Sequence, residues 1–318
     1  MSVALLFSPQ GSQSVGMGRE LAEHQSPARS VFEAADAVLE WSVSDLAWAG
    51  PEDRLNDTRW TQPALLTTSV AALAALEGRM DPKPAFVAGH SVGEYAALVA
   101  AHVLAFPDAL RLVARRGELM AGANAAGGMS AVIGLDRSAV ADAIAASASP
   151  ADLVIANDNA PGQVVISGTQ QALLDAAPVL REAGARRIIA LQVSGPFHSP
   201  WMAEVTESLA DTFDTVQWSD ADPPVVSNVT GEPVTDAGMI RGLLAEQVRS
   251  PVEWVASVRR MVSDGVDTFV ECGPGSALAG MVKRIVPNAR ILHVADEASL
   301  DATVQFLSGL PAAASVQA

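Results

Sequence analysis

The chain has 318 residues, 49% of them hydrophobic and 18% charged, which favours a folded protein with a substantial core over a disordered one. Its formal net charge of −16 argues against general binding to nucleic acid or to an anionic membrane surface. A single cysteine excludes an internal disulfide framework, and neither a basic–apolar leader nor a membrane-length apolar run is present. We expect a cytoplasmic protein with one large domain or two smaller ones.

The first elements of the chain indicate an α/β protein. Residues 4–7 predict a buried strand, which is followed by the turn-rich run SPQGSQSVGMG. That run is not a phosphate-binding loop, because no Gly-Lys-Ser/Thr ending follows it. Residues 61–76, rich in alanine and leucine, predict a helix, and residues 85–88 predict a second buried strand.

The turn after this second strand carries a candidate nucleophile. Residues 89–93, GHSVG, match the G-x-S-x-G nucleophile elbow, in which a sharp strand-to-helix turn exposes the serine hydroxyl. The crowded turn requires glycine two residues to either side of the serine. However, Ser91 and Glu94 also match S-x-x-E, the capping box of a helix start. The motif alone therefore leaves two interpretations, a nucleophile or a helix cap.

After the elbow, the order of predicted elements changes. Two helices are predicted at 92–102 and 107–120. A β-α-β-β-α-β series then begins near residue 126, which is the ferredoxin-like arrangement. Its elements are predicted at 129–135, 137–147, 153–156, 163–167, 170–183 and 187–193. Past residue 200 the mixed order resumes, with strands near 224–228 and 267–271 and a helix over 276–286.

This order predicts an α/β fold in which a small subdomain is inserted into a larger domain. The larger domain is expected to be α/β-hydrolase-like and the inserted subdomain ferredoxin-like. The predicted boundaries are 1–125 and 197–308 for the large catalytic domain, 126–196 for the subdomain and 309–318 for a loose tail.

A serine nucleophile needs a neighbouring base, and the chain offers five histidines. His90 adjoins the serine, and consecutive side chains point in different directions. His24 and His102 are expected near helix ends, away from the serine. His198 lies in a turn-forming loop and His293 after a short apolar strand. Because loops often carry catalytic groups, His198 is favoured, but spacing alone leaves both open.

The helix predicted at 107–120 places a charge on an apolar stripe. Residues 109, 113, 116 and 120 share one face, which is apolar except for Arg116, whereas Arg115 falls on a solvent face. A buried guanidinium needs a partner, either a protein carboxylate or the carboxylate of a substrate. Arginine can grip a carboxylate through two parallel hydrogen bonds. Serine, histidine and buried arginine together suggest acyl transfer from an acid-bearing substrate.

Seven short motifs run in order along the chain. They are QGSQ (10–13), TQPA (61–64), GHSVGE (89–94), RG (116–117), NAPGQ (159–163), GPFH (195–198) and CGPG (272–275). Together they resemble the malonyl-CoA:acyl carrier protein transacylase family of bacterial fatty acid synthesis, and acyltransferase domains of polyketide synthases are similar. The resemblance covers nearly the whole chain, from residue 5 to about 286, and is far more specific than any one motif.

The resemblance implies a role for each matching residue. Ser91 would be the acylated nucleophile and His198 its general base, oriented by the main-chain carbonyl of Gln247. Arg116 would hold the malonyl carboxylate. Asn159 would lie near the site at the edge of the small subdomain.

Three further positions bear on the acyl group. The backbone N–H groups of Gln10 and Val92 would form the oxyanion hole, and the ring of Phe197 would crowd the methyl group of methylmalonyl substrates. The family's usual Pro-Gly before Gln-Gly-Ser-Gln is Ser8-Pro9 here. The proline removes one N–H and restricts the loop, but it leaves the N–H of Gln10 for the oxyanion hole.

The implied activity is ping-pong transfer of a malonyl group from malonyl-CoA to the phosphopantetheine thiol of an acyl carrier protein. The coenzyme A thioester would be a substrate, with no bound cofactor and no metal. Carrier proteins are usually acidic, so docking would need a local basic patch such as residues 186–187 or 283–284.

Several alternatives stay open. A serine thioesterase or esterase would place its histidine late in the chain, which would favour His293. The protein could also be a discrete acyltransferase of a polyketide pathway, or a carrier-binding subunit without activity. Cys272 is a weaker candidate nucleophile, because no histidine lies near it in sequence.

Overall fold

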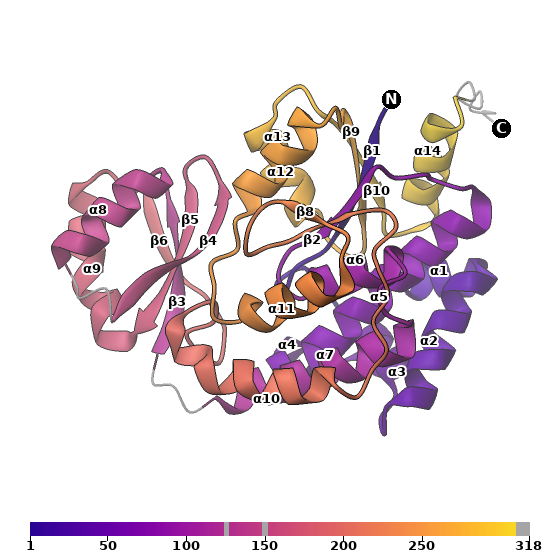
Figure 1. Ribbon diagram of the computed structural model, residues 1–318, viewed down its shortest axis with the longest axis horizontal. Coiled ribbons are helices and arrows are strands. Elements are labelled where there is room, and N and C mark those ends of the chain that lie inside the picture. Colours follow the sequence, from indigo (N-terminus) through magenta and orange to yellow (C-terminus); the bar gives the residue numbers. More distant parts are fainter. Residues whose placement is uncertain (124–126, 148–151, 310–318) are drawn as a thin grey trace.

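The computed structural model describes residues 1–123, 127–147 and 152–309, and two separate sheets organise them (Figure 1). The larger sheet has six strands in the order β10-β9-β1-β2-β7-β8, and the smaller has four in the order β4-β5-β3-β6. The strands of the larger sheet are β1 (Val3–Phe7), β2 (Phe86–Gly89), β7 (Val225–Val226), β8 (Pro233–Val234), β9 (Thr268–Cys272) and β10 (Arg290–Val294).

Strand β1 shows why the larger sheet is buried on both faces. All five of its residues are buried, which is typical of a parallel strand with helices on either side. Because side chains alternate along a strand, Leu6 packs in one hydrophobic cluster with α12 (Trp254–Ser263) and α13 (Ala277–Ile285). Phe7 packs in the other cluster with α5 (Thr58–Arg79). The apolar run that predicted this strand therefore serves both faces.

The carboxyl ends of three parallel strands meet at one edge of this sheet. Phe7 of β1 lies opposite Gly89 of β2 and Cys272 of β9 in the parallel register. In open α/β sheets, ligands bind beyond this carboxyl edge. The loops that leave it carry three of the sequence motifs, and the chemistry is expected there.

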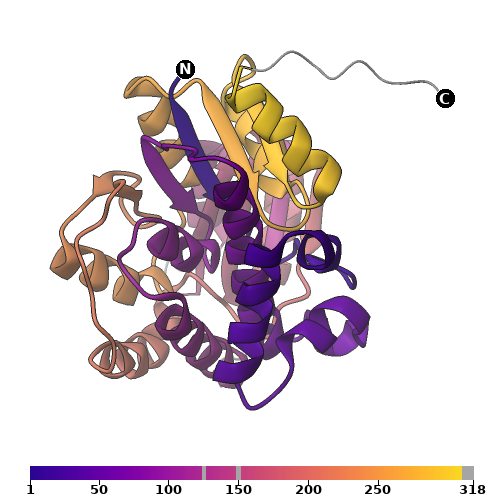
Figure 2. The same ribbon diagram turned by 90° about the vertical axis from the view of Figure 1, so that its right-hand side faces the viewer.

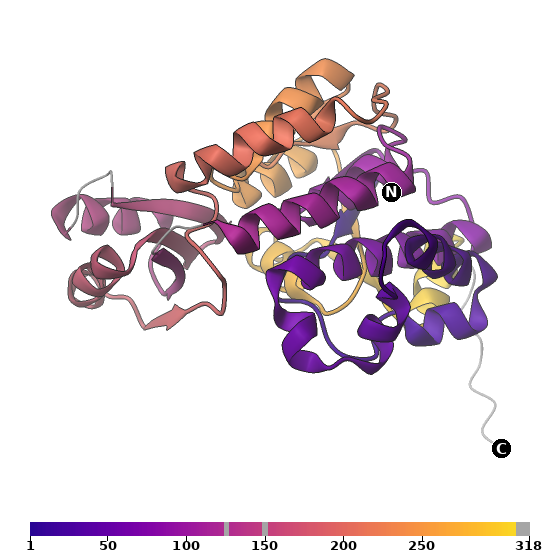
Figure 3. The same cartoon turned by 90° about the horizontal axis from the view of Figure 1, so that it is seen from below.

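The helices surround the larger sheet. They are α1 (Arg19–His24), α2 (Ser26–Val38), α3 (Val43–Ala49), α4 (Glu52–Asn56), α5, α6 (Gly93–Ala100), α7 (Phe106–Gly122), η1 (Pro200–Met202), α10 (Ala203–Phe213), α11 (Ala237–Gln247), α12, α13 and α14 (Glu297–Leu307). Helix α14 lies beside the edge strand β10 (Figure 2), and α7 runs beside α10 (Figure 3). The helices predicted after the first strand, around the elbow and near the end are confirmed as α5, α6, α7 and α13, whereas the others were not predicted.

The smaller sheet is wholly antiparallel and has its own hydrophobic cluster. Its elements are β3 (Gly127–Ile133), α8 (Arg137–Ser147), β4 (Leu153–Ala160), β5 (Gln163–Thr169), α9 (Gln170–Glu182) and β6 (Arg187–Ala190). The two helices pack together on the side away from the larger sheet (Figure 1). The predicted fold, an α/β domain that carries a small ferredoxin-like subdomain, is confirmed.

The details of the prediction differ at a few points. Strand β6 ends at Ala190 rather than at 193, because the chain leaves the sheet and brings Leu191 and Val193 to the cavity beside Ser91. The predicted boundary at 125–126 and the predicted tail beyond Gly309 lie outside the described residues. In the part of the chain that the structure describes, no helix has the length and apolar character needed to cross a membrane.

Candidate active site

The elbow predicted at Ser91 is a strained turn at the carboxyl end of β2. Ser91 has φ of 54°, in the left-handed region that non-glycine residues rarely adopt. A Cβ atom on Gly89 would collide with the backbone of Gly93, and one on Gly93 would collide with the carbonyl oxygen of Phe7. The chain packs so closely here that only glycine fits on either side of the serine.

The helix-cap interpretation of Ser91 is wrong. The residue before α6 is Val92, and no side chain caps this helix. The carboxylate of Glu94 accepts hydrogen bonds from Gln247 and from the backbone N–H of Asn228, so no capping box forms. The Ser91 hydroxyl is therefore free for other contacts.

That hydroxyl faces the imidazole of His198. Ser91 Oγ lies 2.8 Å from His198 Nε2. The other ring nitrogen, Nδ1, lies 3.0 Å from the carbonyl oxygen of Gln247 and 3.2 Å from that of Ser250. Because carbonyls only accept, we assign the hydrogen to Nδ1, and Nε2 can then accept the serine proton. Burial lowers the pKa of His198 to about 3, with a further contribution from nearby Arg116, so the ring is neutral and its Nε2 lone pair is free to accept a proton.

This lowered pKa predicts an unusual pH profile. The basic form of His198 is present at every pH above about 3 and is lost only as pH falls through that value. We expect the rate of Ser91 acylation at saturating malonyl-CoA to change by no more than about twofold between pH 8 and pH 5.5. An imidazole with an ordinary pKa would be largely protonated at the lower of these two pH values. Rapid-quench mass spectrometry measures this rate. Loss of half the rate near pH 6.5 would contradict the assignment.

The guanidinium of Arg116 is the second group that contacts Ser91. The side chain is only 1% exposed, as the stripe on its helix predicted. Its Nη1 donates to Gln62 Oε1 at 2.7 Å, and its Nη2 donates to Ser91 Oγ at 3.1 Å and to Gln247 Oε1 at 3.0 Å. Neighbouring Arg115 is exposed and pairs with Glu118.

The partners of Arg116 decide between the two interpretations of its burial. Within the described residues it makes no ion pair, and its charge is held by the neutral amides of Gln62 and Gln247. Burial lowers its pKa, whereas Tyr95 and Glu94 act to raise it. A cation held at the nucleophile by neutral groups can receive an anionic substrate, so the interpretation as a structural ion pair is wrong.

Sequence reasoning did not assign roles to three groups that build this site. Gln62 lies in the TQPA motif, but the sequence alone gives this residue no function. Asn228 accepts from the backbone N–H of Ser91 at 2.6 Å and donates to the carbonyl oxygen of Gly89 at 2.6 Å, so it braces the elbow. It follows strand β7, which neighbours β2, and its position at the end of the strand predicted at 224–228 was an available signal. Glu94 was considered only as a cap.

A cavity of about 100 Å³ opens beside Ser91 between the two sheets. Its lining residues are Pro9, Gln10, His90, Ser91, Met120, Met129, Asn157, Leu191, Val193, Phe197 and His198. In the described part of the chain, no hydrogen bond occupies the backbone N–H of Gln10 or Val92, so both donors are available to an oxyanion. Phe197 is 4% exposed and narrows this cavity beside the serine.

The remaining predicted residue, Asn159, braces the neighbouring histidine. Its Oδ1 lies 2.8 Å from Nε2 of His90, whose ring packs against Trp254 at 5.5 Å between centroids. Burial lowers the pKa of His90 to about 4. His90 therefore forms part of the wall of the cavity, and its contact with Asn159 connects the elbow to strand β4.

The rival candidates lie elsewhere. His293 is on β10, three strands from β2 in the sheet, and its Nε2 lies 3.1 Å from the carbonyl oxygen of Gly273. Cys272 is fully buried, and burial raises the pKa of its thiol, which disfavours the thiolate. Neither residue meets the base or the guanidinium, so neither alternative nucleophile–base pair forms.

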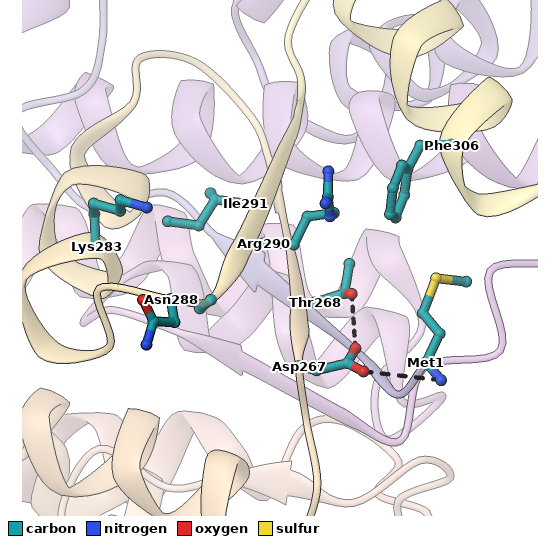
Figure 4. Close-up of a pocket in the computed structure, with 9 residues that line it drawn as sticks. Met1, Asp267, Thr268, Lys283, Asn288, Arg290, Ile291 and Phe306 are labelled. Carbon is teal, nitrogen blue, oxygen red and sulfur yellow. Dashed lines mark hydrogen bonds and ion pairs between the residues drawn. The ribbon is translucent and has the colours of Figure 1, made fainter. Parts of the chain in front are cut away.

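A larger cavity, of about 610 Å³, lies away from this chemistry (Figure 4). It is near the amino ends of β9 and β10, and its lining includes Thr268, Arg290 and Phe306. The guanidinium of Arg290 stacks on the ring of Phe306, 4.4 Å from its centroid. Ser91 leaves the opposite, carboxyl edge of the same sheet, so size alone does not locate the active site.

A neutral imidazole and a buried guanidinium on one serine hydroxyl, beyond the carboxyl edge of a parallel sheet, define a serine acyltransferase-type site. Residues 4–305 match the family model described as "Acyl transferase domain". The chain belongs to the malonyl-CoA:acyl carrier protein transacylase family.

Three relatives illustrate how close this likeness is. The chain is 42% identical over 308 residues to the malonyl CoA-acyl carrier protein transacylase of Bacillus subtilis (strain 168), covering 96% of this chain and 97% of that one. It is 40% identical to an acyl carrier protein S-malonyltransferase from Vibrio cholerae, with a TM-score of 0.92 over 95% and 100% of the two chains. A malonyl-transacylase solved in complex with its type II polyketide synthase acyl carrier protein is 37% identical, with a TM-score of 0.92 over 96% and 100%.

Proposed function

We propose that this protein transfers a malonyl group from coenzyme A to the phosphopantetheine thiol of an acyl carrier protein through a malonyl-serine intermediate. One observation carries the proposal. The hydroxyl of Ser91 contacts the neutral imidazole of His198 and the buried guanidinium of Arg116 at the same time. The relatives named malonyl transacylases share nearly the whole chain with it.

In the first half of the cycle, Ser91 Oγ attacks the thioester carbonyl of malonyl-CoA while its proton passes to His198 Nε2. The N–H groups of Gln10 and Val92 stabilise the oxyanion, which is worth about 3–4 kcal/mol for one such donor. The C–S bond then breaks, and the coenzyme A thiolate takes the proton from His198. The malonyl carboxylate takes the place of Ser91 Oγ as a partner of Arg116.

In the second half, the carrier thiol gives its proton to His198 and attacks the malonyl ester. The ester C–O bond breaks, and His198 returns the proton to Ser91. This cycle uses the coenzyme A thioester as a substrate and assigns no step to a bound cofactor. The ring of Phe197 restricts the space beside the acyl group, which supports a preference for malonyl over branched donors.

The carrier protein is proposed to dock on basic surface near the small subdomain. One relative was solved in complex with its acyl carrier protein, which supports a carrier protein as the partner of this chain. Arg186 and Arg187 are exposed at the edge strand β6, which leads directly to cavity residues Leu191 and Val193. Arg284 is less available, because it donates to Gln163 and to the carbonyl of Pro161. Residues 186–187 are therefore the better of the two basic candidates.

Intact-mass analysis tests the function directly. Malonyl-CoA is expected to add one malonyl group to the wild-type chain, and later addition of a phosphopantetheinylated carrier protein to move that group to the carrier. Ser91→Ala should gain no mass. If the adduct is lost to water at the same rate with and without carrier protein, the thioesterase alternative replaces this proposal.

A further inference from the structure

Glu94 is a buried carboxylate that the proposed mechanism does not use. Its side chain is 3% exposed and, among the described residues, pairs with no cation within ion-pair distance. Its Oε2 instead accepts from Gln247 Nε2 at 2.6 Å and from the backbone N–H of Asn228 at 3.3 Å. Burial raises the pKa of Glu94 to about 7, which shows how costly this placement is for the charged form.

Gln247, whose side chain donates to Glu94, contacts the other main groups of the site. The Nε2 of Gln247 donates to Glu94 and, at 3.0 Å, to the carbonyl oxygen of Ser91, while its Oε1 accepts from Arg116. The backbone carbonyl of the same residue accepts from His198 Nδ1 at 3.0 Å. One residue at the end of α11 therefore connects the nucleophile loop, the base and the guanidinium.

The amide of Gln247 can satisfy these neighbours in only one orientation. Glu94 and the Ser91 carbonyl present acceptors, so they require the NH₂ group, whereas Arg116 presents donors and requires the oxygen. A reversed amide would set its NH₂ group against the guanidinium and its oxygen against the carboxylate. The acceptor at Glu94 fixes which end of the amide faces the cation.

We propose that Glu94 is a positioning residue, whose oxygen holds the Gln247 amide so that Arg116 and His198 keep their places beside Ser91. The inference rests on the proposed function. It assigns the effect to a hydrogen-bond acceptor rather than to charge, because a neutral oxygen at this place also accepts from Gln247. Glutamine at position 94 should therefore preserve the arrangement, and an apolar residue of similar length should not.

Substitutions at two positions test this. We would measure kcat and KM with malonyl-CoA and acetyl-CoA for Glu94→Gln, Glu94→Met, Gln247→Ala and the double variant of the last two. Glu94→Met should lower the malonyl-to-acetyl ratio of kcat/KM about tenfold, the equivalent of one hydrogen bond, whereas Glu94→Gln should stay within about threefold of wild type. The double variant should be no worse than Gln247→Ala alone, within about twofold.

Glu271→Gln is the matched control. Glu271 is also buried, accepts two backbone N–H groups from α13 and has its pKa raised to about 7 by burial, but neither hydrogen bond involves Ser91, His198 or Gln247. This variant should change the melting temperature without changing the malonyl-to-acetyl ratio. Three results would overturn the proposal. The first is an unchanged malonyl-to-acetyl ratio in Glu94→Met, and the second is a loss in the double variant equal to the product of the two single losses. The third is a change of this ratio in Glu271→Gln as large as that in Glu94→Met.

A second readout separates this inference from the proposed function. Phenylmethylsulfonyl fluoride labels an activated serine without using Arg116 or coenzyme A. If wild-type protein does not transfer malonyl, the proposed function fails, but labelling of Ser91 still reports whether His198 is in place. Slower labelling of folded Glu94→Met than of Glu94→Gln supports the positioning role, and equal labelling overturns it.

Discussion

Replacing His198 with alanine is expected to slow acylation of Ser91 by malonyl-CoA about 10²-fold to 10⁴-fold, the usual contribution of a well-placed general base. The imidazole accepts the serine proton at 2.8 Å, and the carbonyl oxygen of Gln247 fixes its tautomer. No other described histidine contacts the hydroxyl, so nothing replaces it. Mass spectrometry under single-turnover conditions measures the acylation rate, and Ser91→Ala, which cannot be acylated, is the negative control.

His293→Ala is the matched control for this variant. His293 also contacts a backbone carbonyl, that of Gly273, and it is the base that a thioesterase order would require. Its loss should leave the acylation rate within about twofold, because ordinary substitutions away from a site have small effects. If His293→Ala were the slower of the two variants, the assignment of the base would be wrong.

Arg116→Ala is expected to lower kcat/KM for malonyl-CoA about 100-fold and to leave that for acetyl-CoA much less affected. A charge-assisted hydrogen bond is worth about 1.5–3 kcal/mol, and only the malonyl group offers a carboxylate to the guanidinium. The preference for malonyl should therefore nearly vanish. The variant also removes the partner of the buried amide of Gln62 and should melt at a lower temperature.

Two variants separate recognition from charge and from folding. Arg115→Ala removes the adjacent exposed arginine, which pairs with Glu118, and should keep wild-type selectivity. Arg116→Lys keeps a positive charge but lacks the planar fork that reaches both amides, so it should recover only part of the malonyl rate. Unchanged preference for malonyl over acetyl in Arg116→Ala would refute the role of this residue.

The sequence alone predicted some residues of this site but not the partners that they meet. Ser91 followed from a local motif and the burial of Arg116 from helical periodicity, because both are properties of one short segment. His198 was favoured by its loop and by the family resemblance, but spacing did not separate it from His293. Gln62 stood within a motif of that resemblance, yet no local rule gave it a partner.

The capping-box match shows why local rules have limits. The pattern S-x-x-E is present at the start of α6, but Glu94 contacts Gln247 and Asn228 instead of the helix end. Those partners come from loops and helices more than a hundred residues away in the chain. Glu94 makes these tertiary contacts rather than a local cap because they satisfy buried polar groups that the cap would leave without partners.

By itself, the sequence determined the order of elements, the α/β fold with its inserted small sheet, and the elbow at Ser91. These depend on apolar periodicity and glycine positions, which act over a few neighbouring residues. Only the tertiary structure decided that His198, Arg116 and Gln247 meet at one hydroxyl, and that His293 does not. Strand order in the sheet and the packing of α7 and α11 set those distances, and both depend on which surfaces bury one another rather than on any local pattern.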